Sequence, residues 1–145
     1  MRIKRRFPAA LALAAGLTAA FSLAGDDRPI SFAGEVAPIL VRRCLACHGP
    51  RKAFAGYRVD TFARLRADTE AGRLIEPGRP GDSLFLDLIV LSEPTGRMPK
   101  NGDPLPEAEV RALRRWIEQG AGSTGLDPDA DLARVVGPAP RPFRP

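Results

Sequence analysis

Glycine and proline interrupt the apolar patterns of this chain so often that it can form only short helices joined by loops. The 145 residues include 14 glycines and 15 prolines, and the stretches 76–81 and 92–106 are especially dense in them. Such residues favour turns and end regular elements. Short helices in long loops bury little apolar surface, so a domain of this kind often needs a covalent link or a cofactor to complete its core.

Apolar residues recur at helical spacing in four segments, which are 31–43, 61–68, 83–89 and 106–119. Ser31 is expected to cap the first segment, and Pro38 to kink or open it, because proline has no N–H to donate. No convincing alternation typical of β-strands is present. The sequence therefore predicts an all-α fold for residues 31–121, with short helices and Gly/Pro-rich loops.

The ends of the later helices are also marked in the sequence. Asp82 or Ser83 is expected to cap the third segment. Pro106 suits the first turn of the fourth segment, where a missing N–H is no loss, and Gly120 is a plausible stop.

The first 24 residues have the organisation of a secretory signal peptide. A basic start precedes an uncharged Ala/Leu-rich run from Phe7 to Ala24, with small residues at its end. The alternative is an uncleaved membrane anchor, because the run reaches the lower edge of a spanning length, about 17 residues. Alanine drives insertion weakly, which favours cleavage. We expect a bacterial protein that is periplasmic or otherwise exported, with no membrane association after cleavage.

Export changes the charge of the chain and excludes one class of partner. Without the basic residues of the leader, which are Arg2, Lys4, Arg5 and Arg6, the balance of 22 basic against 17 acidic residues becomes 18 against 17. The net charge falls from +5 to +1. Nucleic-acid binding needs a basic stripe on the folded domain, so no nucleic-acid partner is expected.

Two segments flank the predicted domain. Residues 25–30 are interpreted as a linker. Residues 122–145 are interpreted as a Pro-rich, disordered tail with at most a weak helix at 130–135, because four of the last eight residues are prolines.

The motif Cys44-Leu-Ala-Cys47-His48 carries the strongest chemical signal. C-x-x-C-H is the attachment signature of haem c. Two cysteines three residues apart near a helix end face the same way and can bond the two vinyl groups, and the imidazole of the next residue can coordinate the iron. The cofactor expected is one covalent haem c, bonded through Cys44 and Cys47, with His48 as the proximal axial ligand.

Closely spaced cysteines also occur in three other kinds of site. A structural zinc site needs about four ligands, and the chain has only Cys44, Cys47 and His48 of the strong types. A thioredoxin-like C-x-x-C would follow a strand in a βαβ unit, which the pattern does not show. A plain Cys44–Cys47 disulfide in a non-haem interaction module stays open.

Met98 is the candidate for the distal axial ligand. His48 is the only histidine, and Met1 would leave with the leader, so Met98 is the only methionine of the mature protein. It lies in a Pro/Gly-rich loop just before the last helix, from which its thioether could reach the open face of a haem. Pro99 restricts Met98 to extended conformations. The alternative is a methionine that only fills space.

Several motifs together resemble the planctomycete-type cytochrome c domain, over about residues 32–121. They are Phe32-x-x-Glu35-Val36-x-Pro38-Ile39-Leu40, Cys44-x-x-Cys47-His48-Gly49, Val59-Asp60-Thr61, Glu76-Pro77-Gly78-x-Pro80-x-x-Ser83-Leu84, Met98-Pro99 and Trp116-Ile117-x-x-Gly120-Ala121. Lys100 replaces the second proline that usually follows the methionine. The resemblance implies a class I-like cytochrome c fold wrapped around one haem c, with His48 and Met98 on the iron.

Two axial ligands leave no open iron position, so we expect a single-electron carrier with transient redox partner proteins rather than an enzyme. The alternative is a haem enzyme or sensor, such as a peroxidase-like protein, in which Met98 is labile or absent from iron. Trp116 is considered both as helix core and as a residue packing at the haem edge with its N–H toward a propionate. Four basic residues are expected to be solvated rather than propionate partners, namely Arg97, Lys100, Arg114 and Arg115.

Overall fold

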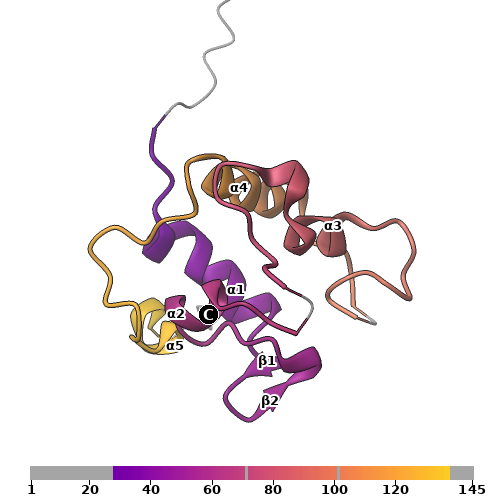
Figure 1. The fold of residues 1–145 in the computed structure, drawn as a ribbon, viewed down its shortest axis with the longest axis horizontal. Coiled ribbons are helices and arrows are strands. Elements are labelled where there is room, and N and C mark those ends of the chain that lie inside the picture. Colours follow the sequence, from indigo (N-terminus) through magenta and orange to yellow (C-terminus); the bar gives the residue numbers. More distant parts are fainter. Residues whose placement is uncertain (1–27, 71, 101, 138–145) are drawn as a thin grey trace, which may run out of the picture.

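The computed structural model describes residues 28–70, 72–100 and 102–137, and most of its elements are helical (Figure 1). In chain order they are η1 (Phe32–Val36), α1 (Ala37–Arg43), β1 (His48–Gly49), β2 (Lys52–Ala53), η2 (Phe54–Gly56), α2 (Phe62–Arg66), η3 (Pro80–Asp82), α3 (Leu84–Val90), α4 (Glu107–Glu118) and α5 (Leu132–Val136). The expectation of a helix-rich fold is confirmed, with β1 and β2 forming a small antiparallel hairpin. Within the described ranges, no helix has the length and hydropathy needed to cross a membrane.

The first helix begins after Ser31, as predicted, and changes its hydrogen-bond pattern before Pro38. The Ser31 hydroxyl accepts the N–H of Gly34 at 3.1 Å. The N–H of Ala37 bonds back five residues to the carbonyl of Phe32, so η1 is a π-helical turn that leads into α1. Because Pro38 cannot donate to the ordinary α-helical ladder, the wider turn accommodates it.

Ser83 occupies the N-cap position of α3, as predicted, but its hydroxyl is used elsewhere. The buried Oγ accepts the N–H of Glu76 at 2.9 Å and donates to the carbonyl of Arg79 at 3.0 Å. Asp82, the other candidate cap, lies inside η3. The hydroxyl of Ser83 therefore closes the turn-rich segment before the helix instead of capping α3.

The helix α4 ends where glycine is required. Pro106 is its N-cap residue, one position earlier than predicted. Gly120 has φ +95°, in the left-handed region that favours glycine, so the helix stops there as expected. Leu113, Trp116 and Ile117 form the buried face of α4.

The two ends of the domain meet in the core. The ring of Phe32 in η1 lies 5.5 Å from that of Trp116 in α4 and 5.0 Å, edge-on, from that of Phe62 in α2. Val36 and Leu40 are fully buried beside them. Packing of η1 and α1 on α4 and α5 thus forms the part of the core that holds the start of the cysteine motif (Figure 1).

Residues 122–137 fold onto the domain, so the expectation of a disordered tail is wrong for this part of the chain. Leu132 is fully buried, and its N–H donates to the carbonyl of Asp60 at 2.8 Å. The N–H of Ala63 donates to the carbonyl of Pro128 at 2.8 Å, and Asp131 caps α5. The buried Leu132, the partly buried Leu126 and Val136, and these backbone bonds attach the segment to the core.

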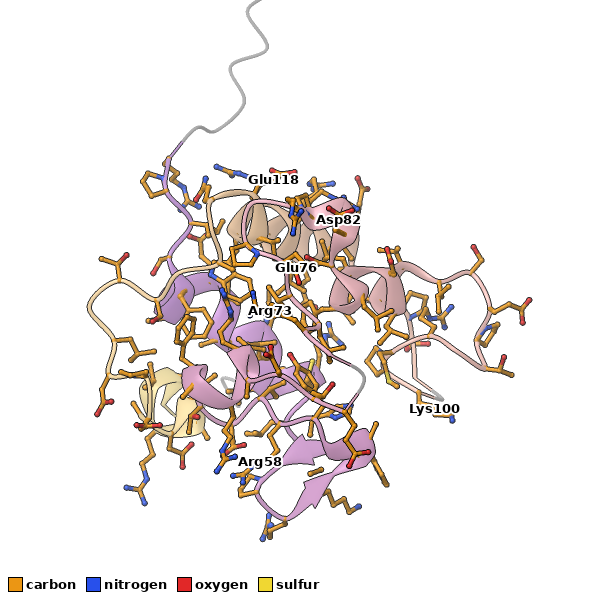
Figure 2. All side chains as sticks on the ribbon, in the orientation of Figure 1. Arg58, Arg73, Glu76, Asp82, Lys100 and Glu118 are labelled. Carbon is orange, nitrogen blue, oxygen red and sulfur yellow. The ribbon has the colours of Figure 1, made fainter. Side chains whose placement is uncertain are left out.

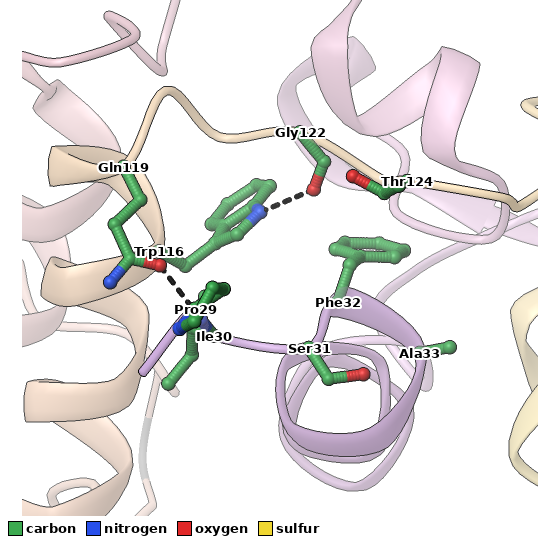
Figure 3. A pocket seen from close by; sticks show the side chains of 9 residues that line it. All are labelled: Pro29, Ile30, Ser31, Phe32, Ala33, Trp116, Gln119, Gly122 and Thr124. Atoms are coloured by element: carbon green, nitrogen blue, oxygen red, sulfur yellow. Dashed lines mark hydrogen bonds between the residues drawn. The ribbon is translucent and has the colours of Figure 1, made fainter. Parts of the chain in front are cut away.

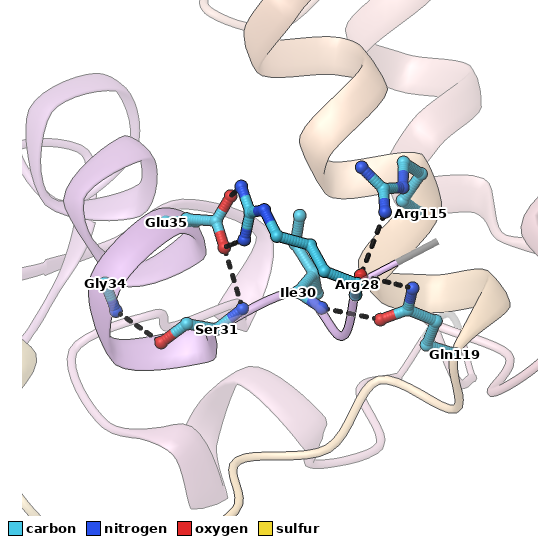
Figure 4. A network of polar contacts seen from close by, with 7 residues as sticks. All are labelled: Arg28, Ile30, Ser31, Gly34, Glu35, Arg115 and Gln119. Atoms are coloured by element: carbon cyan, nitrogen blue, oxygen red, sulfur yellow. Dashed lines mark hydrogen bonds and ion pairs between the residues drawn. The ribbon is translucent and has the colours of Figure 1, made fainter. Parts of the chain in front are cut away.

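The predicted linker is also too long at its C-terminal end. The N–H of Ile30 donates to Gln119 Oε1 at 2.7 Å, and the Arg28 carbonyl accepts from Arg115 at 2.9 Å, so residues 28–30 are bound to α4 (Figure 4). The predicted signal peptide, residues 1–24, and the last eight residues lie outside the described part of the chain.

Replacing Leu132 with alanine is expected to lower the free energy of unfolding by about 2–4 kcal/mol, because it leaves a cavity under α5. Urea unfolding of the mature protein measures this. Arg134→Ala is the control in the same helix, since its side chain is 89% exposed, and its effect should stay within about 0.5 kcal/mol. Equal, small effects of the two substitutions would show that α5 does not stabilise the domain.

Glu35 binds the N-terminal segment to the start of the first helix (Figure 4). Its carboxylate accepts two hydrogen bonds from Arg28, at 2.7 and 2.8 Å, and one from the N–H of Ser31 at 2.9 Å. The Arg28 contacts first, then that of Ser31, lower the pKa of Glu35 from 4.5 to about 2.

The stability that Glu35 contributes should be present above pH 4.5 and lost as the pH falls toward 2, because its folded-state pKa is the lower one. Glu35→Gln should therefore destabilise the protein at pH 7, by no more than about 1 kcal/mol at this surface position, and the deficit should shrink at pH 2.5. Urea unfolding at both pH values measures it. A deficit of the same size at both would contradict this role.

Candidate functional site

The four predicted haem-binding residues come together around one hollow in the molecule. Two adjoining cavities, of about 570 and 170 Å³, share five lining residues, which are Cys44, His48, Ala55, Ile89 and Met98. Cys47 lines the larger cavity as well. Volumes of roughly 300–1,000 Å³ are typical of small-molecule and cofactor sites. The structure thus juxtaposes side chains that the sequence separates by about fifty residues.

The end of α1 positions the cysteine motif. The N–H of Cys44 donates to the carbonyl of Leu40, and the N–H groups of Cys47 and His48 both donate to the carbonyl of Cys44, at 3.1 and 2.9 Å. This turn brings all three side chains to the larger cavity. The two cysteines are free thiols. Burial, and then the charge of Glu109, raises the pKa of Cys44 to about 12, so this thiol is neutral at pH 7 and suits an apolar wall.

His48 is held by a hydrogen bond on one ring nitrogen. Its Nδ1 lies 3.2 Å from the carbonyl oxygen of Tyr57. A carbonyl can only accept, so Nδ1 carries the hydrogen and Nε2 keeps its lone pair for a metal. The backbone of His48 is held as well, because its carbonyl accepts the N–H of Val59 at 2.7 Å. The imidazole is therefore oriented, in the tautomer that a ligand needs.

Met98 comes from a different part of the wall. Its N–H donates to the carbonyl of Leu88 in α3 at 2.8 Å, which attaches the proline-rich loop to that helix. The loop is closed further by a bond from the N–H of Gly102 to the carbonyl of Pro99 at 3.2 Å. Met98 is half-buried and lines both cavities, so a core-filling role alone does not account for its place.

The lining of the hollow fits a haem. Most side chains around the smaller cavity are apolar or aromatic, including Tyr57, Val59, Leu74, Phe85, Leu88 and Ile89. An imidazole, a thioether and two thiols open onto the same space, which is the donor set of a covalently attached haem with two axial ligands. Residues from the end of α1, from η2 and from α3 thus form walls for a flat apolar group.

The basic residue at the hollow and the four basic residues that the sequence predicts to be solvated have different partners. Arg43, at its rim, is paired with Glu109 at 2.9 Å, and this hydrogen bond raises the pKa of Arg43. Arg97 donates to the carbonyl of Gly102 at 3.3 Å and Arg115 to that of Arg28. The predicted solvation of these two side chains is therefore incomplete.

Of the other two basic residues, Arg114 is exposed on α4. Lys100 is also exposed, at the outer end of its loop (Figure 2), and lines the larger cavity. Lys100 is thus a cation placed at the mouth of the site.

Trp116 does not reach this site, so the suggestion that it packs at a haem edge is wrong. Its indole N–H donates to the carbonyl of Gly122 at 2.8 Å, and its ring packs beside Phe32 (Figure 3). It lines a separate, shallow hollow with Ser31 and Gln119. The structure agrees instead with the other expectation, a tryptophan in the helix core.

Two residues that sequence reasoning missed belong to the site. Tyr57 contacts His48 through its carbonyl and lines the smaller cavity. Phe54, in η2, lines the larger one and is 58% exposed. The only signal for either was its position within ten residues of the cysteine motif.

A clustered metal site of another kind is not indicated. Within the described ranges, no three His, Cys, Asp or Glu side chains gather closely enough to hold a metal ion.

Comparison with known families identifies the region that contains the site. Residues 44–102 match the family described as Planctomycete cytochrome C. The matched region begins at Cys44 and includes Cys47, His48 and Met98. Neither the curated proteins nor the solved structures compared with the chain include a match.

Proposed function

We propose that this protein is an exported monohaem electron carrier, since residues 44–102 match the family described as Planctomycete cytochrome C. It exchanges single electrons with transient redox partner proteins and catalyses no reaction of its own. The observation that carries the proposal is the shared hollow, where an oriented imidazole, a thioether and the cysteine pair face one apolar space.

Each of the four residues has a separate task. Cys44 and Cys47 would hold the haem through thioether bonds. His48 would offer Nε2 to the iron while its Nδ1–H stays on the Tyr57 carbonyl. Met98 would supply a second protein ligand from the loop attached to α3. When bound, haem supplies an Fe(III)/Fe(II) couple for one electron.

The apolar walls and the axial ligands each have a consequence for electron transfer. Leu74, Phe85 and Ile89 are each less than 10% exposed, so they exclude water and favour the less charged, reduced state. With His48 and Met98 both bound to the iron, no position on the metal would remain for a substrate. This arrangement supports a carrier over an enzyme.

Export is part of the proposal. The basic, apolar and small-residue order of residues 1–24 is typical of a secretory leader, and bacterial haem c is attached outside the cytoplasm.

The absorption spectrum of the protein, matured together with a haem-attachment system, tests this function. A low-spin, six-coordinate haem in both redox states is expected. High-spin haem that binds added small ligands would favour an enzyme or sensor, and a protein without haem bands would favour a thiol or disulfide module.

A further inference from the structure

Tyr57 makes hydrogen bonds through both its backbone carbonyl and its hydroxyl, and the carbonyl bonds to the proposed proximal ligand. Its carbonyl accepts from His48 Nδ1 at 3.2 Å, while its hydroxyl donates to the carbonyl of Leu65 at 3.2 Å. The ring lies edge-on to the imidazole, with centroids 5.7 Å apart. Tyr57 is only 7% exposed, so the hydroxyl bond is buried, while the bond to His48 is partly buried.

The hydroxyl end is fixed to a firm part of the fold. Leu65 lies in the last turn of α2, where helix carbonyls lack intrahelical partners, so the tyrosine hydroxyl satisfies one of them. Leu65 itself is 1% exposed. The helix is attached further by the cap at Thr61 and by the bond from Arg66 to the carbonyl of Ala121 at 2.8 Å.

The backbone around Tyr57 is otherwise a loop. Residues 54–56 form a single 3-10 turn in which Ala55 and Gly56 have positive φ. The N–H of Tyr57 closes this turn on the carbonyl of Phe54 at 3.2 Å. Besides this turn, the hydroxyl bond to Leu65 fixes Tyr57, so the side chain helps to set the position of the Tyr57 carbonyl.

We infer that Tyr57 is a positioning residue that sets the reduction potential by holding its carbonyl against His48 Nδ1. The inference rests on the proposed function, because it takes His48 as an iron ligand. A firm Nδ1–H···O bond makes the imidazole a stronger donor, which favours Fe(III) and lowers the potential. The electron that reduces the protein comes from a reduced partner protein, and an oxidised partner removes it.

Tyr57→Phe tests this, since it deletes the hydroxyl and keeps the ring and the carbonyl. In the holoprotein, the potential should shift to more positive values, the Nδ1–H of His48 should exchange faster with solvent, and the haem should stay low-spin. Ser83→Ala is the matched control. It also deletes one buried hydroxyl that donates to a carbonyl, but Ser83 does not line the hollow.

If Tyr57→Phe does not fold, a second measurement tests the same inference. Tyr57 is the only tyrosine of the chain, so growth on 3-fluorotyrosine changes this hydroxyl alone. The fluorinated phenol is a stronger donor, which should tighten the anchor and move the potential in the opposite, negative direction. Ser83→Ala should lose stability and leave the potential unchanged.

Two failures can be told apart. If Tyr57→Phe and the fluorinated protein both keep the native potential and Nδ1–H exchange, with a normal low-spin spectrum, Tyr57 is only structural and this inference is overturned. If the native protein itself shows no low-spin haem ligated by histidine, the proposed function fails, and this inference fails with it.

Discussion

Met98→Ala is expected to lower the reduction potential on the order of 0.1–0.3 V, within the roughly 0.8 V range over which axial ligands act. The thioether is a soft donor that favours Fe(II), and alanine removes it. The oxidised variant should also lose the weak long-wavelength band of Fe(III)–thioether ligation and bind small ligands. Redox titration and absorption spectroscopy measure both effects. Met98→His should keep low-spin iron while lowering the potential.

Lys100 provides the control for this prediction. It lies two residues from Met98, lines the same cavity and is exposed, so a general disturbance of the loop would affect both positions. Lys100→Ala should leave the iron spectrum unchanged at neutral pH. A spectrum that depends on Lys100 and not on Met98 would assign the distal ligand to the lysine instead.

The haem-free polypeptide is expected to be largely unfolded or molten, because a group that binds only the native state stabilises it. The structure gives the reason. α1 packs chiefly on η1 and α5, α3 packs on α4, and η1 also packs on α4. Residues of α1 and α3 both face the hollow. A bound haem would add contacts between α1 and α3 by filling the space between them.

Thermal unfolding followed by circular dichroism measures this effect. The Cys44→Ser/Cys47→Ser double variant should show no sharp transition, and neither should the unmodified chain made without haem-attachment enzymes. The unmodified chain keeps both thiols and lacks only the haem. If it behaves like the double variant, the effect is due to the missing haem and not to the missing thiols. Cooperative melting of either one near the temperature of the holoprotein would contradict the prediction.

Local signals in the sequence were sufficient for most of the helical part of the fold. The cap at Ser31, the missing N–H of Pro38 and the stop at Gly120 act within a few residues, so the sequence shows them directly. The ligand candidates could be named because the chain has so few histidines, cysteines and methionines. Their convergence on one hollow is information that the structure adds.

Contacts between residues far apart in sequence explain why the predictions for residues 122–137 and for Trp116 were wrong. Helix α5 lies close to the weak helix expected at 130–135, and it is held by packing on α1 and by the bond from the N–H of Leu132 to the carbonyl of Asp60. Both partners are distant in sequence, so the segment itself does not show that it folds onto the domain. The partner of Trp116 is set by how the chain leaves α4, through positive φ at Gly120 and Ala121. Periodicity correctly indicated a buried face there but could not identify the hydrogen-bond acceptor.

The contact between Tyr57 and His48 could not be predicted, for a different reason. The group that contacts His48 is a backbone carbonyl, which every residue has, so the side chain at this position carries no direct signal of ligand positioning. Only the fold shows that its hydroxyl reaches Leu65.

The mass of the mature protein after denaturation tests the central claim most directly. A single species equal to the polypeptide plus one haem is expected, and digestion should leave the haem on the peptide that contains Cys44, Cys47 and His48. A protein of bare polypeptide mass, with two free thiols or a Cys44–Cys47 disulfide, would contradict the claim that this domain is a covalent haem carrier.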